Sequence, residues 1–173
     1  MRAAKRSGFS LVELIVVVVI IGILAAIAIP RFSRGATGAG ASGVGGNLQV
    51  LRNAIELYYY EHGEYPGKNA AGAAAAGSEA AFIAQLTKYS DANGGVSDTP
   101  TGEFKFGPYL RKGIPPCPVA PRAGKSGISM INTGTPAYTA GAADAGWVFN
   151  YETGDICVNS NDTDADGKSY DTY

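Results

Sequence analysis

The stretch that decides the fold is Gly8-Phe9-Ser10-Leu11-Val12-Glu13-Leu14, which continues into an apolar segment ending at Ile29-Pro30. No side chain from Leu14 to Ile29 is polar, and the basic residues Arg2, Lys5 and Arg6 precede the stretch. As a helix that rises about 1.5 Å per residue, segment 9–29 is about 31 Å long, which matches a hydrocarbon core of about 30 Å. The pattern predicts a membrane-spanning helix with a cytoplasmic N-terminal flank and the bulk of the chain outside.

Glu13 is unusual in such a helix, because a carboxylate inside a bilayer costs a few kcal/mol and is usually functional. The alternative is that Glu13 reaches back to the headgroups, since it stands close to the membrane edge. A cleavable secretory signal with Ala26-Ile27-Ala28 as its cleavage site is a second alternative. The length of the apolar run and the Glu at its start argue against that signal.

The residues Gly8 to Leu14, together with Pro30, resemble the class III signal of type IV pilins and type II secretion pseudopilins. The resemblance implies that a prepilin peptidase cleaves between Gly8 and Phe9 and that Phe9 is then N-methylated. It also implies that Glu13 neutralises the α-amine of a neighbouring subunit during assembly. Such a pair would offset the cost of two charges at similar depth and would set the axial register.

Beyond the membrane segment the helix is predicted to continue with interruptions. Pro30 should kink or interrupt it. Residues Gly35 to Gly46 include six glycines, each of which costs up to about 1 kcal/mol in a helix interior, so continuity there is open. Apolar residues then recur on one helical face and predict a half that packs on a domain: Val44, Leu48, Leu51, Ile55 and Tyr58.

The end of this helix carries a second resemblance. Asn53–Pro66 resembles the continuation of G-type pseudopilins, in which the helix ends in a Gly-x-Tyr-Pro turn, here Gly63 to Pro66. The resemblance favours the secretion branch over classical pilins. His62, the only histidine, is expected to stabilise the helix end.

The best strand signal is Trp147-Val148-Phe149-Asn150-Tyr151, which alternates aromatic and other residues. A turn at 152–155 leads to Ile156-Cys157-Val158, so the segment predicts a β-hairpin. Trp147, Phe149 and Tyr151 should share the face that presses on the helix. The predicted fold class is α+β: a long N-terminal helix, half transmembrane and half amphipathic, packed on a small antiparallel sheet, the pilin-like architecture that the resemblance implies.

The same reading divides the chain into four segments. Residues 1–8 are a leader peptide, and residues 9–30 are a transmembrane and assembly helix. Residues 31–63 are a glycine-rich and then amphipathic continuation of it. Residues 64–173 form one globular domain outside the cytoplasm, in the size range of a single small core.

The two cysteines, Cys117 and Cys157, lie in a region where a disulfide can persist. A bond between them would tie a proline-rich loop to the last strand and give about 3–4 kcal/mol in the chain-entropy model. Two buried free thiols are the alternative.

The C-terminal segment carries carboxylates at alternate positions, Asp162, Asp164 and Asp166, followed by a glycine. Such spacing can turn oxygens onto one hard cation, so calcium is the predicted cofactor. The position of the EF-hand's twelfth residue holds Tyr173 instead of Glu, and a solvated acidic tail is the alternative. The resemblance to calcium-binding G-type pseudopilins supports a site without supplying its ligands.

Several function classes have little support. The net charge is −1, and no Lys/Arg cluster follows the leader, which argues against nucleic-acid binding. There is no nucleophile–base pair, phosphate loop or zinc spacing, so the chain is not expected to be an enzyme.

The sequence therefore predicts a structural subunit of a type II secretion pseudopilus. It would be anchored in the inner membrane with a periplasmic domain and would polymerise with copies of itself. Its expected partners are prepilin peptidase, an inner-membrane platform, an ATPase and minor pseudopilins. A type IV pilus subunit for adhesion, motility or DNA uptake is the first alternative. A membrane-tethered, calcium-dependent binding module is the second.

Overall fold

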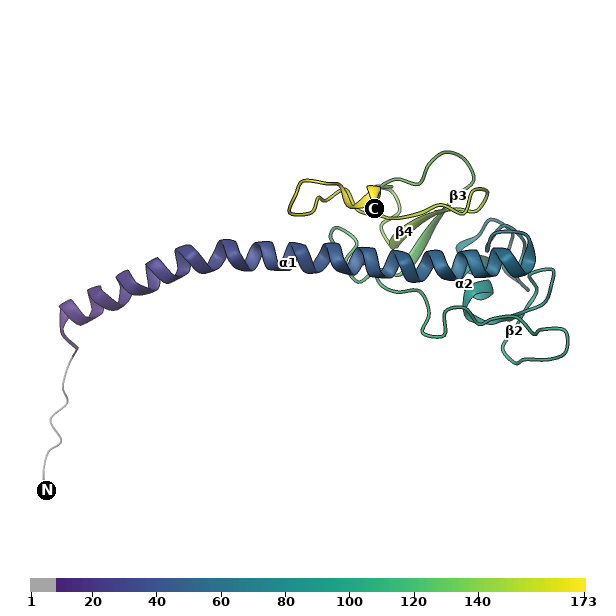
Figure 1. Ribbon diagram of the computed structural model, residues 1–173, viewed down its shortest axis with the longest axis horizontal. Helices are drawn as coiled ribbons and strands as arrows, with labels where there is room; N and C mark the ends of the chain where they lie inside the picture. Colours follow the sequence, from purple (N-terminus) through teal and green to yellow (C-terminus); the bar gives the residue numbers. More distant parts are fainter. Residues whose placement is uncertain (1–8) are drawn as a thin grey trace, which may run out of the picture. The chain divides into compact units, whose positions relative to one another are not determined.

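The structure is a computed structural model that describes residues 9–173, with the backbone alone described at residues 29–37. The chain divides into two compact units between Thr37 and Gly38. Helix α1 (Leu11–His62) contributes to both units (Figure 1). The predicted leader, residues 1–8, lies outside the described residues.

In the first unit, Leu11–Ala28 is long and apolar enough to cross a membrane by length and composition. None of this segment is buried within the chain. Its apolar side chains are therefore not covered by the rest of this chain, as expected of a segment covered by lipid or by other protein chains.

Helical structure continues through Pro30 and through the glycine-rich stretch, so the expectation of an interruption at Pro30 is wrong. A proline removes one N–H, and its fixed φ is compatible with a helix. Two glycines also allow close packing: a Cβ on Gly40 would lie 3.0 Å from Val119 Cγ1, and one on Gly43 would lie 3.2 Å from Pro118 Cβ. Close approach of the 118–119 loop offsets part of the cost of glycine in the helix.

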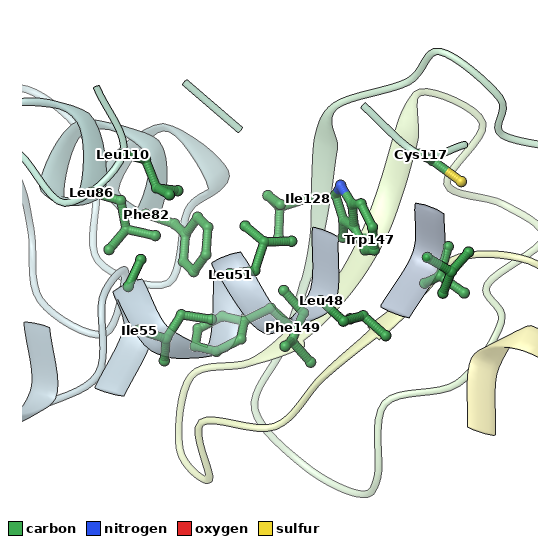
Figure 2. Packing of buried hydrophobic residues seen from close by; sticks show 14 of the residues in the cluster. Leu48, Leu51, Ile55, Phe82, Leu86, Leu110, Cys117, Ile128, Trp147 and Phe149 are labelled. Atoms are coloured by element: carbon green, nitrogen blue, oxygen red, sulfur yellow. The ribbon is translucent and has the colours of Figure 1, made fainter. Parts of the chain in front are cut away.

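The predicted face of α1 forms the core of the second unit. All five of its apolar positions are buried: Val44, Leu48, Leu51, Ile55 and Tyr58. Figure 2 shows Leu48 and Leu51 lying beside Trp147 and Phe149 of the sheet. The Phe149 ring also meets that of Phe82, with 4.7 Å between centroids.

The sheet has three strands in the order β3-β4-β5. β4 (Ala145–Asn150) and β5 (Ile156–Val158) pair antiparallel, with Trp147 opposite Val158, which confirms the predicted hairpin. β3 (Gly127–Ile131) was not predicted and joins β4 in parallel, with Ile128 opposite Trp147. The α+β class is confirmed, with one parallel strand added to the antiparallel pair.

The remaining elements surround this core. α2 (Glu79–Thr87) is capped at its N-terminus by Ser78, whose hydroxyl oxygen accepts a hydrogen bond from Ala81 N–H. β1 (Tyr89–Ser90) and β2 (Val96–Ser97) form a short antiparallel pair, and η1 (Tyr170–Thr172) is a 3-10 turn. Gln85 on α2 is fully buried and bonds to Gly67 N–H and Gly94 C=O, which fastens two loops to the helix.

Replacing Phe149 with alanine should lower the free energy of unfolding by about 3–5 kcal/mol, because it leaves a cavity between α1 and the sheet. Trp147, the single tryptophan, is fully buried and reports unfolding by its fluorescence. Denaturant titration of the full chain in detergent measures the change. Tyr60→Ala is the control: Tyr60 is 87% exposed, so its change should stay within about 0.5 kcal/mol. Equal losses in the two variants would contradict the packing described here.

Candidate processing and assembly site

The first turn of α1 carries the Ser-x-x-Glu pattern of a capping box, with the Ser10 hydroxyl bonded one residue earlier than in the standard arrangement. Ser10 N–H donates to Glu13 Oε2 at 2.8 Å, and Val12 N–H donates to Ser10 Oγ at 3.3 Å. These bonds satisfy N–H groups that a helix leaves unpaired at its start. A carboxylate is also favoured there by the helix dipole.

This arrangement gives Glu13 a local role that the sequence analysis missed. The available signal was the Ser-x-x-Glu spacing of Ser10 and Glu13, which is typical of a helix start. Ser10 N is the amide that directly follows Phe9, so the bond holds the carboxylate next to the residue predicted to carry the new α-amine. A carboxylate can accept several hydrogen bonds, so Glu13 can keep this one and still receive an amine from another subunit.

Gly8 lies outside the described residues, and Phe9 is 88% exposed. The predicted cleavage between them and the methylation of Phe9 therefore stay predictions.

The outer end of α1 is closed by His62. Its Nδ1 lies 2.9 Å from Tyr58 O, its Nε2 lies 3.1 Å from Ser90 Oγ, and its ring stacks on that of Tyr58 at 3.9 Å. Gly63 follows with φ 73°, a conformation that suits the residue after a helix. Both ring nitrogens are therefore used at the helix end, in agreement with the expected stabilising role.

The predicted disulfide is not present: Cys117 and Cys157 are both free and buried. Cys117 packs in the core cluster with α1, and its Sγ donates to Val119 O at 3.2 Å. Cys157 stands opposite Val148 on the sheet and lies outside that cluster. The two thiols occupy different packing environments, and the alternative of two buried thiols is the one that the structure favours.

In the acidic segment, the Asp164 carboxylate is occupied by hydrogen bonds within the chain. Asp164 Oδ1 accepts hydrogen bonds from Asp166 N–H and Lys168 N–H, both at 2.9 Å, and Oδ2 accepts one from the Tyr173 hydroxyl. The Tyr173 bond, with these backbone bonds, holds the pKa of Asp164 below its usual value. Within residues 9–173, no group of three or more His, Cys, Asp or Glu side chains could hold a metal. Calcium binding by Asp162, Asp164 and Asp166 stays an untested prediction.

Comparison with known proteins points to the N-terminal segment. Residues 3–29 match the model of the prokaryotic N-terminal methylation motif. No curated protein and no solved structure gives a significant match to the chain. The motif supports a type IV pilin-like or pseudopilin subunit, a class of structural proteins that are processed by prepilin peptidase and assemble into filaments. The motif and the apolar helix together indicate membrane anchoring.

Both thiols should resist alkylation in the folded protein. Burial, with a contribution from the Asp171 carboxylate, raises the pKa of Cys157 to about 12, and burial also raises that of Cys117. Because the thiolate is the nucleophile, neither group should react with iodoacetamide at pH 8, whereas both should react after denaturation. Intact-mass spectrometry counts the adducts. A chain that stays unlabelled after denaturation without reductant, and gains two adducts with it, would show a disulfide instead.

Proposed function

We propose that this chain is the precursor of the major subunit of a type II secretion pseudopilus. The observation that carries the proposal is the methylation motif at residues 3–29, which leads directly into an apolar helix with Glu13 in its first turn. An α+β unit with a helix packed on a small sheet follows the apolar segment. Beyond a pilin-like subunit, we propose a processing event, an assembly step and a biological system for this chain.

The proposed sequence begins with insertion of the precursor into the inner membrane. Prepilin peptidase cleaves between Gly8 and Phe9, and the new N-terminus of Phe9 is methylated. A platform and an ATPase then extract the subunit into a filament, whose growth pushes substrates through an outer-membrane channel. Minor pseudopilins would take part in assembly.

The exposed apolar side chains of Leu11–Ala28 support a filament core made of such helices. Lipid tails and neighbouring helices are about equally apolar, so leaving the bilayer for the filament changes little hydrophobic free energy. Polar interactions can therefore decide which packing forms. Glu13 is the side chain in this part of the chain that can supply one, by pairing with the Phe9 amine of another subunit.

The outer end of α1 supports the secretion branch. The helix ends at His62, and the Gly63 to Pro66 turn follows with Tyr65 stacked on Tyr59 at 4.3 Å. This Gly-x-Tyr-Pro turn is the feature that resembles G-type pseudopilins. A type IV pilus subunit is the alternative, and long surface filaments that form without a secretion system would favour it.

The mature N-terminus tests the processing step. Mass spectrometry of the chain from its native membrane should find a protein that starts at an N-methylated Phe9. Cleavage removes three basic residues and changes the formal net charge from −1 to −4. Recovery of the chain with Met1–Gly8 attached would contradict the proposal.

Two substitutions separate the charge of Glu13 from its capping role. Glu13→Gln keeps an oxygen that accepts the Ser10 N–H but has no charge, so cleavage should persist while filament yield falls at least about tenfold. Ser10→Ala removes a capping hydroxyl and keeps the charge, so it should still assemble. Sedimentation and electron microscopy of filaments measure both. Normal assembly of the Glu13→Gln variant would contradict the proposed pairing of Glu13 with the Phe9 amine.

A further inference from the structure

Two exposed surfaces of opposite charge lie on the second unit, each with charged side chains that take part in none of the ion pairs within residues 9–173. The first, the basic groove, has a volume of about 560 Å³ and lies between α1 and the segment Pro108–Pro116. Arg111 and Lys112 are exposed there. Among the ion pairs of residues 9–173, neither side chain takes part.

The second surface, the acidic loop, comprises residues 161–168. Asp162 and Asp166 are exposed, and the ion pairs within residues 9–173 do not include them. Asp164 is used differently, because its carboxylate binds the Asp166 and Lys168 N–H groups and the Tyr173 hydroxyl. The Asp164 carboxylate stabilises the turn, while the Asp162 and Asp166 carboxylates are exposed, with Ala165 between them in the chain.

The two surfaces lie on different sides of α1. Asn47 Nδ2 donates to Pro116 O at 3.0 Å, and Val50, which is 50% exposed, lines the groove. Arg52 donates instead to Ile156 O at 3.2 Å and to Tyr173 O at 2.7 Å, and Tyr173 in turn bonds to the acidic loop. Val50 and Arg52 lie about 160° apart around the helix axis. Figure 1 shows the C-terminal loop in yellow on one side of α1.

We infer that the acidic loop of one copy of this chain docks in the basic groove of the next copy. The charges are complementary, and Ala165 at the loop offers a small apolar residue to a groove lined by Val50, Ile114 and Pro115. The surfaces differ and lie on different sides of the subunit, so the contact is heterologous. Such a contact leaves each new copy with a free groove or loop and extends into an open, filament-like array.

This inference rests on the proposed function and adds a second contact, away from the Glu13 amine pair. The paired charges are exposed at a rim, so they should favour the correct neighbour and orientation more than they add raw affinity. The contact should weaken as salt is raised, because charges at a surface are screened within about 10 Å at 0.1 M.

Charge reversal of the full chain in its native membrane tests the contact. Arg111→Glu with Lys112→Glu should lower filament yield at least about tenfold, and Asp162→Lys with Asp166→Lys should do the same, because each places like charges together. All four substitutions in one chain should restore assembly. Glu103→Lys with Lys105→Glu is the control, since both residues are exposed and line neither surface. Unchanged assembly of either reversed pair, or no recovery in the combined variant, overturns the inference.

Cross-linking supplies a second readout that does not depend on filament yield. A chain with Lys112→Cys and Asp166→Cys should form a ladder of disulfide-linked oligomers under mild oxidation, because both ends of the contact then carry an accessible thiol. Either substitution alone should give no ladder, since Cys117 and Cys157 are buried. Absence of the ladder from filaments of that chain overturns the inference.

The outcomes separate this contact from the proposed function. If the wild-type chain forms filaments with methylated Phe9 and the charge-reversed variants still assemble, the proposed function is supported and the docking contact is contradicted. If filaments dissolve when calcium is chelated while the Arg111→Glu variant assembles normally, the acidic loop binds a cation. That result would also contradict the docking contact. If the wild-type chain is never cleaved and never assembles, both the proposed function and the docking contact are contradicted.

Discussion

The packing of the outer half of α1 against β4 is the interaction on which the rest of the structure depends. Leu48, Leu51 and Ile55 of the helix and Trp147 and Phe149 of the strand are all fully or almost fully buried. A three-stranded sheet this small cannot cover its own apolar face, so it needs the helix. The helix is stabilised by the sheet in turn, because the sheet covers the apolar face that the helix would otherwise expose. Each element supplies the surface that stabilises the other.

The same helix has to meet two different environments. Residues Leu14 to Ala28 are apolar on every side and uncovered, as suits lipid or a bundle of like helices. From Val44 onward a single face is buried against the domain. Between them the small residues have a packing function, since Gly40 and Gly43 admit the 118–119 loop at distances that would be tight for an added Cβ. These glycines would lower the stability of an isolated helix, but in the folded unit they allow close contact with the loop.

The acidic segment and the cysteines show that a local pattern leaves open which groups each side chain will meet. The Asp-x-Asp-x-Asp spacing predicts a cation site, and the structure adds that the Asp164 carboxylate accepts hydrogen bonds from two backbone N–H groups and from the hydroxyl of Tyr173, nine residues away. Cys117 and Cys157 suggest a bond from their number and compartment. The fold places one in the helix-facing core and the other outside it. In both cases the neighbours of the side chain depend on which groups the rest of the chain brings close.

The sequence by itself determined the membrane segment, the methylation motif, the buried face of the outer helix and the β4–β5 hairpin. Each of these is a local pattern of hydrophobicity or spacing, and local patterns follow from helix and strand periodicity. Only the tertiary structure decided the parallel addition of β3, the free thiols and the separation of the basic groove from the acidic loop. Parallel pairing and side-chain proximity join residues far apart in sequence, and no periodicity encodes which of them meet. The capping interaction of Glu13 depends on both. The Ser-x-x-Glu spacing can be read from the sequence, and the structure shows the hydrogen bond from Ser10 N–H to Glu13 Oε2.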